Sequence, residues 1–254
     1  MNSVLVDKSG RTTLVTINRP ERRNAVDAET AQRLLEVFAN FDADDDASVA
    51  VLSGAGGTFC AGYDLHSVSS GPPPLDAEGP GPMGPSRMLL SKPVIAAVEG
   101  HAVAGGLELA LWCDMRVAST NAIFGVFCRR WGVPLIDGGT VRLPRVVGHG
   151  RALDMILTGR AVGADEALAM GLASRVVPAG SALKEAISLA EAISAFPQTC
   201  LRADRLSAYR QWDSNLAEAL QAEALAGEVP LREEGLAGAG RFSDGAGRSG
   251  HFNG

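Results

Sequence analysis

The spacing of hydrophobic positions along the chain changes between a strand-like and a helix-like period. Runs rich in β-branched residues at 4–6 and 11–18 flank the turn-forming stretch Asp7-Lys8-Ser9-Gly10, which predicts a hairpin at the start. Asp27 is a predicted N-cap, because apolar residues at helical spacing follow it. Strands that alternate with helices up to about residue 180 predict an α/β arrangement. Further short strands are expected at 49–52, 94–98, 115–118 and 174–177.

The last part of the chain has a different pattern. Helical periodicity with few breakers runs through 181–195, 198–209 and 215–226. We therefore expect a core over 1–195 and a helical C-terminal region over 196–254. The glycine-rich end of that region is expected to be loose unless a ligand or a neighbouring subunit orders it.

One long internal segment is too rich in Pro and Gly for regular structure. Residues 69–86 read SSGPPPLDAEGPGPMGPS, in which neither a helix nor a strand ladder persists. Few of its side chains are expected to anchor it. The sequence therefore predicts a mobile loop at 69–86.

The composition is that of a folded globular protein, with 46% hydrophobic and 20% charged residues. The formal net charge is -6 and no short stretch is dominated by Lys and Arg, which disfavours nucleic-acid binding. No apolar run approaches the roughly 18 residues of a membrane span, and the start lacks a basic stretch followed by an apolar one. We expect a cytoplasmic protein that binds neither nucleic acid nor membrane.

The cysteines do not form a recognisable framework. Cys60, Cys113, Cys128 and Cys200 are widely scattered and include no C-x-x-C pair. This spacing suggests neither a disulfide framework nor a zinc knuckle. We interpret them as reduced thiols and expect no metal site.

Two glycine-bearing turns follow predicted strands, at 58–65 and 100–109. In the second, Gly105 and Gly106 allow close approach of a ligand to the backbone, and the next helix presents unpaired N–H groups. Glu108 falls in the first turn of that helix, where its carboxylate can face the bound group. The alternative is that the glycines only make a turn and Glu108 complements the helix dipole. On the pattern alone, this alternative is favoured.

Other glycine-rich site motifs are not met. Gly54-Ala55-Gly56 is followed by Phe59 where a G-x-G-x-x-G loop needs its third glycine. Neither the G-x-x-x-x-G-K-[ST] motif of P-loop proteins nor the G-x-S-x-G elbow of hydrolases is present. Dinucleotide, P-loop and serine-hydrolase chemistry are therefore disfavoured.

Three segments resemble the signature segments of the crotonase (enoyl-CoA hydratase/isomerase) superfamily, in the usual order and spacing. They are FCAGYDL at 59–65, KPVIAAVEGHAVAGGLELALWCD at 92–114 and GVPLIDGGTVRL at 132–143. The resemblance extends from Asn18-Arg19-Pro20 to the stretch at 167–177, so it covers most of the chain. It implies an α/β fold, a spiral of ββα units followed by a helical C-terminal region that serves as trimerisation element and lid. The family commonly packs into trimers and hexamers, so a homotrimer or hexamer is implied.

The resemblance also implies residue roles in binding an acyl-CoA thioester. The backbone N–H groups of Tyr63 and Gly105 would form an oxyanion hole for the thioester carbonyl. For Arg22 or Arg23, a place near the nucleotide phosphates and a solvated charged loop are comparable interpretations. The residues implied beside the adenine and pantetheine are Ala61, Asp64 and Leu65.

Glu108 matches the first of two catalytic glutamates of the hydratases, whereas Cys128 stands where they have the second. A largely neutral thiol does not replace a carboxylate in water activation. Asp137 lies where some superfamily members have an acidic active-site residue, and an N-cap for the following helix is an equally favoured role.

The leading hypothesis from the sequence is a 2-enoyl-CoA hydratase that uses Glu108 with Asp137. Coenzyme A is then part of the substrate, and no separate cofactor is expected. One alternative is another crotonase-type isomerase or lyase that needs a single acid/base residue. Another, motivated by Cys128, is a weakly catalytic or non-catalytic acyl-CoA binding protein.

Overall fold

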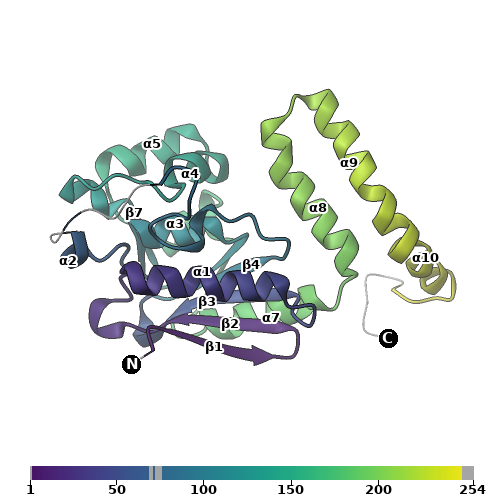
Figure 1. The fold of residues 1–254 in the computed structure, drawn as a ribbon, viewed down its shortest axis with the longest axis horizontal. Helices are drawn as coiled ribbons and strands as arrows, with labels where there is room; N and C mark the ends of the chain where they lie inside the picture. Colours follow the sequence, from purple (N-terminus) through teal and green to yellow (C-terminus); the bar gives the residue numbers. More distant parts are fainter. Residues whose placement is uncertain (1, 69–70, 72–75, 248–254) are drawn as a thin grey trace. The chain divides into compact units, whose positions relative to one another are not determined.

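The computed structural model describes residues 2–68, 71 and 76–247 (Figure 1). They divide into two compact units, Met1–Ile193 and Ser194–Gly254. Residues 69, 70 and 72–75 of the loop predicted to be mobile lie outside the described residues. Among the described residues, no helix is both long and apolar enough to cross a membrane.

The first unit is built on a six-stranded sheet of order β1-β2-β3-β4-β6-β9. β1 and β2 form the predicted antiparallel hairpin, and the other neighbouring strands pair in parallel. Parallel neighbours need crossover connections, which α1 and α3 provide. The strands are β1 (Val4–Ser9), β2 (Thr12–Ile17), β3 (Val49–Gly54), β4 (Val94–Val98), β6 (Met115–Ser119) and β9 (Arg175–Val177).

A second, three-stranded sheet has the order β5-β7-β8. It consists of β5 (His101–Val103), β7 (Ile123–Gly125) and β8 (Val162–Gly163), with β5 and β7 parallel. A parallel bridge between Cys60 and Ala102 joins the segment after β3 to β5. This bridge brings the two glycine-bearing turns of the sequence to one place.

The helices of this unit begin where the sequence provides caps or turns. Asp27 is the N-cap of α1, and its side chain accepts a hydrogen bond from the N–H of Thr30 at 2.9 Å, as predicted. The helices are α1 (Ala28–Ala43), α2 (Leu65–Val68), α3 (Gly105–Trp112), α4 (Gly139–Val147), α5 (His149–Thr158), α6 (Ala164–Ala169) and α7 (Ala182–Ser194). Short 3-10 helices lie at Pro20–Arg22, Ala55–Gly57, Pro85–Arg87 and Phe127–Trp131.

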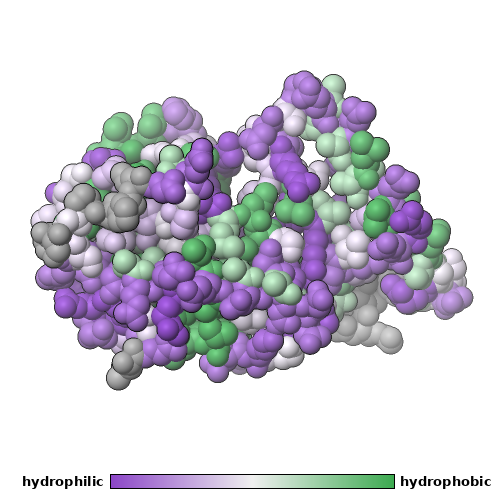
Figure 2. All heavy atoms as spheres, viewed as in Figure 1, coloured by the Kyte–Doolittle hydropathy of each residue, from purple (hydrophilic) through white to green (hydrophobic). Residues whose placement is uncertain are grey.

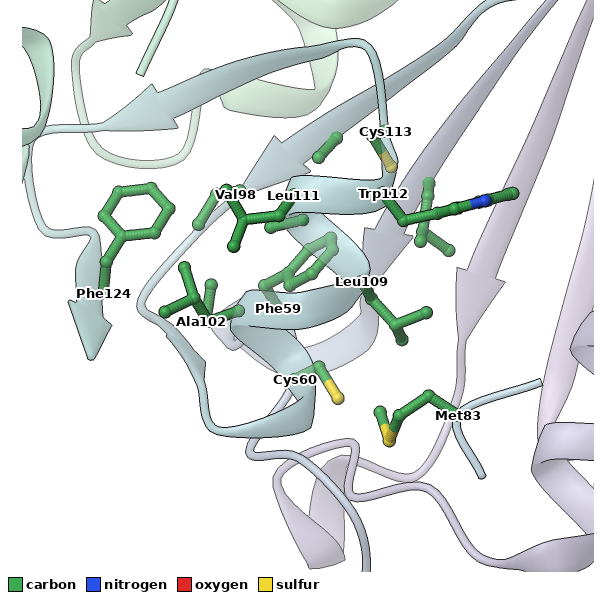
Figure 3. Close-up of a cluster of buried hydrophobic side chains, with 14 of the residues drawn as sticks. Phe59, Cys60, Met83, Val98, Ala102, Leu109, Leu111, Trp112, Cys113 and Phe124 are labelled. Atoms are coloured by element: carbon green, nitrogen blue, oxygen red, sulfur yellow. The ribbon is translucent and has the colours of Figure 1, made fainter. Parts of the chain in front are cut away.

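The main hydrophobic core surrounds α3, every residue of which is buried. Figure 3 shows this region, with Leu109 on the helix and Phe59 and Met83 beside it. The ring centroids of Phe38 and Trp112 lie 4.8 Å apart in an edge-to-face contact, which joins α1 to the end of α3. A helix that is buried on every side is held by its surroundings, so the residues at its N-terminus are held firmly.

The last part of the segment 69–86 is anchored in this core. Met83 and Ser86 are fully buried, and Gly84 has a φ of 87° in close approach to the backbone of Ala31. The expectation that few side chains anchor the segment is therefore wrong for 81–86. Mobility of the segment stays a prediction.

The C-terminal unit consists of helices, as the sequence predicted. Asn215 caps α9 by accepting a hydrogen bond from the N–H of Glu218 at 3.1 Å. The glycine-rich end was expected to be loose, but Leu236–Ser243 form α10. Its elements are α8 (Gln198–Arg210), a 3-10 turn (Gln211–Asp213), α9 (Leu216–Pro230), a π-helical turn (Leu231–Gly235) and α10.

Candidate active site

The two glycine-bearing turns meet at the N-terminus of α3. The N–H of Cys60 donates to the carbonyl of His101 at 2.9 Å, and the N–H of Val103 donates to the carbonyl of Cys60 at 3.1 Å. Cys60 and Ala102 are bridge partners, and Tyr63 and Gly105 each lie three residues after one of them. Gly62 has a φ of 103°, and a Cβ there would lie 2.9 Å from the backbone nitrogen of Gly105. The backbones therefore touch where only glycine fits.

Both turns leave a backbone donor at this junction. Gly105 is the first residue of α3, where an N–H has no acceptor inside the helix. Around Tyr63, the carbonyl of Gly62 and the N–H of Asp64 each bond to Val26 at 2.8 Å, so the N–H of Tyr63 points away from Val26. Tyr63 and Gly105 line the same cavity. Two neighbouring donors on one wall suit a carbonyl oxygen.

That cavity has a volume of about 410 Å³. Its titratable lining groups are Tyr63, Glu108, Cys128 and Asp137, and most other lining side chains are apolar. An apolar wall with a few polar groups is typical of a site for an apolar ligand that reacts at one end. The larger apolar and aromatic lining residues are Leu65, Val68, Pro82, Phe127, Trp131, Val133, Pro134 and Ile136.

Glu108 is buried in the cavity wall with an exposed fraction of 2%. Its Oε1 accepts hydrogen bonds from the N–H groups of Asp137 at 2.9 Å and Gly139 at 2.8 Å. Burial raises the pKa of Glu108 to about 7; the charge of Asp137 adds to this effect, and the Gly139 N–H opposes it. A carboxyl group with this pKa is suited to proton transfer near neutral pH.

Asp137 lies beside Glu108 and is also buried, with an exposed fraction of 3%. Its Oδ1 accepts hydrogen bonds from the N–H of Met83 at 3.0 Å and from the hydroxyl of Ser86. The N-cap of α4 is Gly138, and no side chain caps this helix, so the N-cap interpretation of Asp137 is wrong. Burial raises the pKa of Asp137, and the hydrogen bonds from Ser86 and Met83 oppose this rise.

Cys128 lines the same cavity from the 3-10 helix Phe127–Trp131. Its thiol pKa is raised, first by burial and then by the charge of Glu108. The thiol is therefore neutral at physiological pH. The structure places a weakly polar neutral group at the position where the resemblance expects a second glutamate.

Two of the five predicted CoA-binding residues line the cavity, and the other three do not. Ala61 and Leu65 line the cavity. Asp64 is buried, accepts a hydrogen bond from the His66 N–H at 3.1 Å and lies 3.3 Å from the Arg19 guanidinium. Its carboxylate is thus engaged in holding the turn. Arg22 and Arg23 are exposed and do not line the cavity.

The residues that support Asp137 were not predicted from the sequence. Arg142 donates to the carbonyl of Asp137 at 3.0 Å and to the carbonyl of Ser86 at 2.7 Å. Arg87 donates to the carbonyl of Ile136 at 3.2 Å. Only Arg142 lay within a motif of the resemblance, at the end of the segment 132–143.

The fold and the arrangement of the cavity define a protein of the crotonase superfamily. The enoyl-CoA hydratase/isomerase family model matches residues 7–237, and the chain belongs to this family. An enoyl-CoA hydratase of Mycobacterium tuberculosis is 44% identical over 198 residues, which are 75% of this chain and 74% of the relative.

Further relatives span nearly the whole chain. The mevalonyl-coenzyme A hydratase of Aspergillus fumigatus is 34% identical over 230 residues, covering 85% of this chain and 84% of its own. A crystal structure of an enoyl-CoA hydratase from Mycobacterium tuberculosis superimposes with a TM-score of 0.89 at 34% identity. The superposition covers 95% of this chain and 96% of that chain. The protein is an enoyl-CoA hydratase-like enzyme.

Proposed function

We propose that the protein catalyses the reversible addition of water to a trans-2-enoyl-CoA. The observation that supports this reaction most directly is Glu108, a buried carboxyl group with a pKa of about 7, in one cavity with Asp137. Carboxyl groups that exchange protons near neutral pH are suited to general acid and base catalysis. The family relationship supplies the substrate class.

The thioester carbonyl oxygen accepts hydrogen bonds from the N–H groups of Tyr63 and Gly105. These donors belong to a rigid junction, so they need little reorganisation as negative charge develops on the oxygen. By analogy with other oxyanion holes, each donor contributes about 3 kcal/mol to the stability of the transition state. The polarised carbonyl makes the β-carbon of the conjugated double bond electrophilic.

Glu108 and Asp137 divide the proton transfers. Asp137 takes a proton from water as the water oxygen bonds to the β-carbon, and the electron pair of the double bond moves into the enolate. Glu108 gives its proton to the α-carbon as the enolate collapses to the thioester. Asp137 now holds a proton and Glu108 has lost one, and exchange with solvent restores the pair. Dehydration follows the same steps in reverse.

The remaining contacts of the substrate follow from the cavity. Its apolar wall takes an apolar acyl group, while Ala61 and Leu65 contact the pantetheine and adenine parts. Asp64 supports this contact indirectly, because its buried carboxylate holds the turn that carries both residues. We assign the attraction of the phosphates to Arg22 or Arg23, both of which are exposed. Coenzyme A is part of the substrate, and the proton transfers need no further cofactor. A cytoplasmic location stays a prediction.

Cys128 favours a second candidate. A neutral thiol at the position of a second glutamate leaves fewer groups to activate water, which suits an isomerase or lyase with one acid/base residue. A weakly catalytic acyl-CoA binding protein fits the same observation. Both predict that Asp137 is dispensable for whatever turnover Glu108 supports.

Variants of the two carboxyl groups separate these candidates. Glu108→Gln is expected to abolish turnover with little change in CoA affinity, and Asp137→Asn to lower kcat by a factor of about 10²–10⁴. The double variant is expected to lose less than the product of the single losses, because the two groups share one task. Full activity of Asp137→Asn on every substrate that requires Glu108 contradicts the proposed pair.

We also propose that the protein forms a homotrimer or a hexamer. Large hydrophobic side chains are exposed on the C-terminal unit, and Figure 2 shows hydrophobic residues among hydrophilic ones on its surface. Extensive apolar exposure is typical of an association surface. Sedimentation velocity is expected to show three or six copies, and a monomer at micromolar concentration contradicts the proposal. The exposed residues include Phe196, Trp212, Leu216, Leu220, Leu225, Leu231, Leu236 and Phe242.

A further inference from the structure

Asp137 is tied to a segment far away in the sequence. Its Oδ1 accepts hydrogen bonds from the Met83 N–H and the Ser86 hydroxyl, 54 and 51 residues earlier in the chain. Arg142 binds the carbonyls of both Asp137 and Ser86, and Arg87 binds the carbonyl of Ile136. Several hydrogen bonds therefore join the segment 81–87 to the turn 136–138 around the Asp137 carboxylate.

The contact between Ser86 and Asp137 depends on the missing side chain of Gly81. Ser86 has an exposed fraction of 0%, so water does not compete for its hydroxyl. A methyl group at Gly81 would overlap both Ser86 Oγ and Asp137 Oδ1. The absence of a side chain at Gly81 is thus a condition for this hydrogen bond.

The same segment supports the proposed oxyanion donor. A Cβ at Gly105 would lie 2.6 Å from Sδ of Met83, so the Met83 side chain packs directly against the backbone of Gly105. Met83 and Ser86 lie three residues apart in the segment. One short stretch therefore contacts both Gly105, where the thioester carbonyl would bind, and Asp137, where the water would be activated.

We propose that Ser86 is a positioning residue that keeps the Asp137 carboxylate ionised and turned toward the water to be activated. This proposal rests on the proposed role of Asp137. The Ser86 hydroxyl and the Met83 N–H both donate to Oδ1 of Asp137, which leaves Oδ2 to accept the proton of the water. A hydroxyl donor stabilises a carboxylate and has much less to offer a carboxylic acid, so it favours the ionised form.

Other charged groups around Asp137 act on its ionisation as well. Arg87 and Arg142 favour the carboxylate, whereas Glu108 and burial disfavour it. Tyr63 also lies within the electrostatic reach of Asp137. Ser86 differs from the arginines because its hydroxyl bonds directly to the carboxylate oxygen, whereas Arg142 bonds to the backbone carbonyl of Asp137.

Ser86→Ala removes the hydroxyl and leaves the rest of the segment. This hydroxyl donates a hydrogen bond to a charged group, and the loss of such a bond is expected to raise the pKa of Asp137 by about one pH unit. The acid limb of the kcat/KM profile is then expected to move to higher pH by about the same amount. At a pH one unit below the original limb, kcat/KM is expected to fall about tenfold relative to the wild type.

The matched control is Ser119→Ala. Ser119 is equally buried, and its hydroxyl lies within hydrogen-bond distance of two acceptors away from the cavity, Oδ1 of Asn121 and the carbonyl of Val98. It is expected to lower stability to a similar extent as Ser86→Ala, because both remove one buried hydroxyl. Its pH profile is expected to match that of the wild type, which separates a positioning role from a loss of stability.

A second readout does not depend on turnover. Carbon-13 NMR of protein labelled at aspartate carboxyl carbons, with Asp137→Asn for assignment, follows the ionisation of Asp137 directly. A higher titration midpoint in Ser86→Ala supports the proposal, and an unchanged midpoint overturns it. If the midpoint rises while Asp137→Asn keeps full activity, the role of Asp137 in the reaction is wrong and the contact with Ser86 stands.

Gly81→Ala tests the same contact with the hydroxyl still present. Its methyl group overlaps both Ser86 Oγ and Asp137 Oδ1 and separates them, so the titration midpoint is expected to rise as in Ser86→Ala. This variant serves if Ser86→Ala fails to fold. In that case, a midpoint in Gly81→Ala equal to that of the wild type overturns the proposal.

Discussion

The buried carboxyl group of Glu108 is expected to lower the stability of the folded protein at neutral and alkaline pH. Its pKa is about 7 in the folded protein, against a usual value of 4.5. The folded state therefore holds this proton more tightly than the unfolded state does. Between pH 4.5 and pH 7, the carboxyl group ionises in the unfolded state but stays protonated in the folded state. Ionisation therefore stabilises the unfolded state relative to the folded state.

The magnitude follows from the difference between the two pKa values. At about 1.4 kcal/mol for each unit of pKa, ionised Glu108 lowers the free energy of unfolding by about 3 kcal/mol above pH 7. Below pH 4.5 the carboxyl group is protonated in both states and this difference vanishes. Glu108→Gln keeps a neutral acceptor for the Asp137 and Gly139 N–H groups, so it resembles the protonated wild type.

We therefore expect Glu108→Gln to be more stable than the wild type at pH 8, although it is inactive. Urea unfolding at fixed protein concentration, repeated from pH 4.5 to 8, measures the difference between the two free energies of unfolding. This difference is expected to grow as pH rises and to level off above pH 7. The control is Glu191→Gln, at an exposed residue of α7. A difference that stays constant from pH 5 to 8 contradicts the raised pKa.

Two other substitutions test neighbouring parts of the cavity. Gly105→Ala is expected to lower kcat by about 10²–10³, because its Cβ presses on Met83 and shifts the N–H that faces the thioester oxygen. Normal turnover in steady-state kinetics, with a melting temperature near that of the wild type, means that this N–H is not an oxyanion donor. Cys128→Ala is expected to keep kcat within about threefold, because a neutral thiol transfers no proton in the proposed steps. A loss of a hundredfold assigns the thiol a catalytic role.

Local sequence signals predicted the elements that position the site. The apolar run at 94–98 became β4, and the glycine pair at 105–106 marked the start of α3 as expected. The spacing of glycine, apolar and capping residues is a local property, so it can be read without knowing the fold. The family resemblance then supplied the arrangement of these elements, which local patterns do not contain.

The support of Asp137 could not be predicted in this way. Ser86 lies 51 residues before Asp137 in a stretch whose Pro and Gly content indicated a loop with few anchoring side chains. The same composition that prevents regular structure also permits the close approach at Gly81 and Gly84. For Asp137, the pattern of an acidic residue before a helix favoured an N-cap equally, and only the tertiary contact distinguishes the two roles.

The hydration assay is the most direct test of the proposed reaction. Purified protein is incubated with short and medium trans-2-enoyl-CoA thioesters, and the loss of absorbance of the conjugated thioester is followed with identification of the product. We expect the wild type to form 3-hydroxyacyl-CoA and Glu108→Gln to form none. Tight CoA binding by the wild type, with no consumption of any enoyl-CoA, contradicts a hydratase.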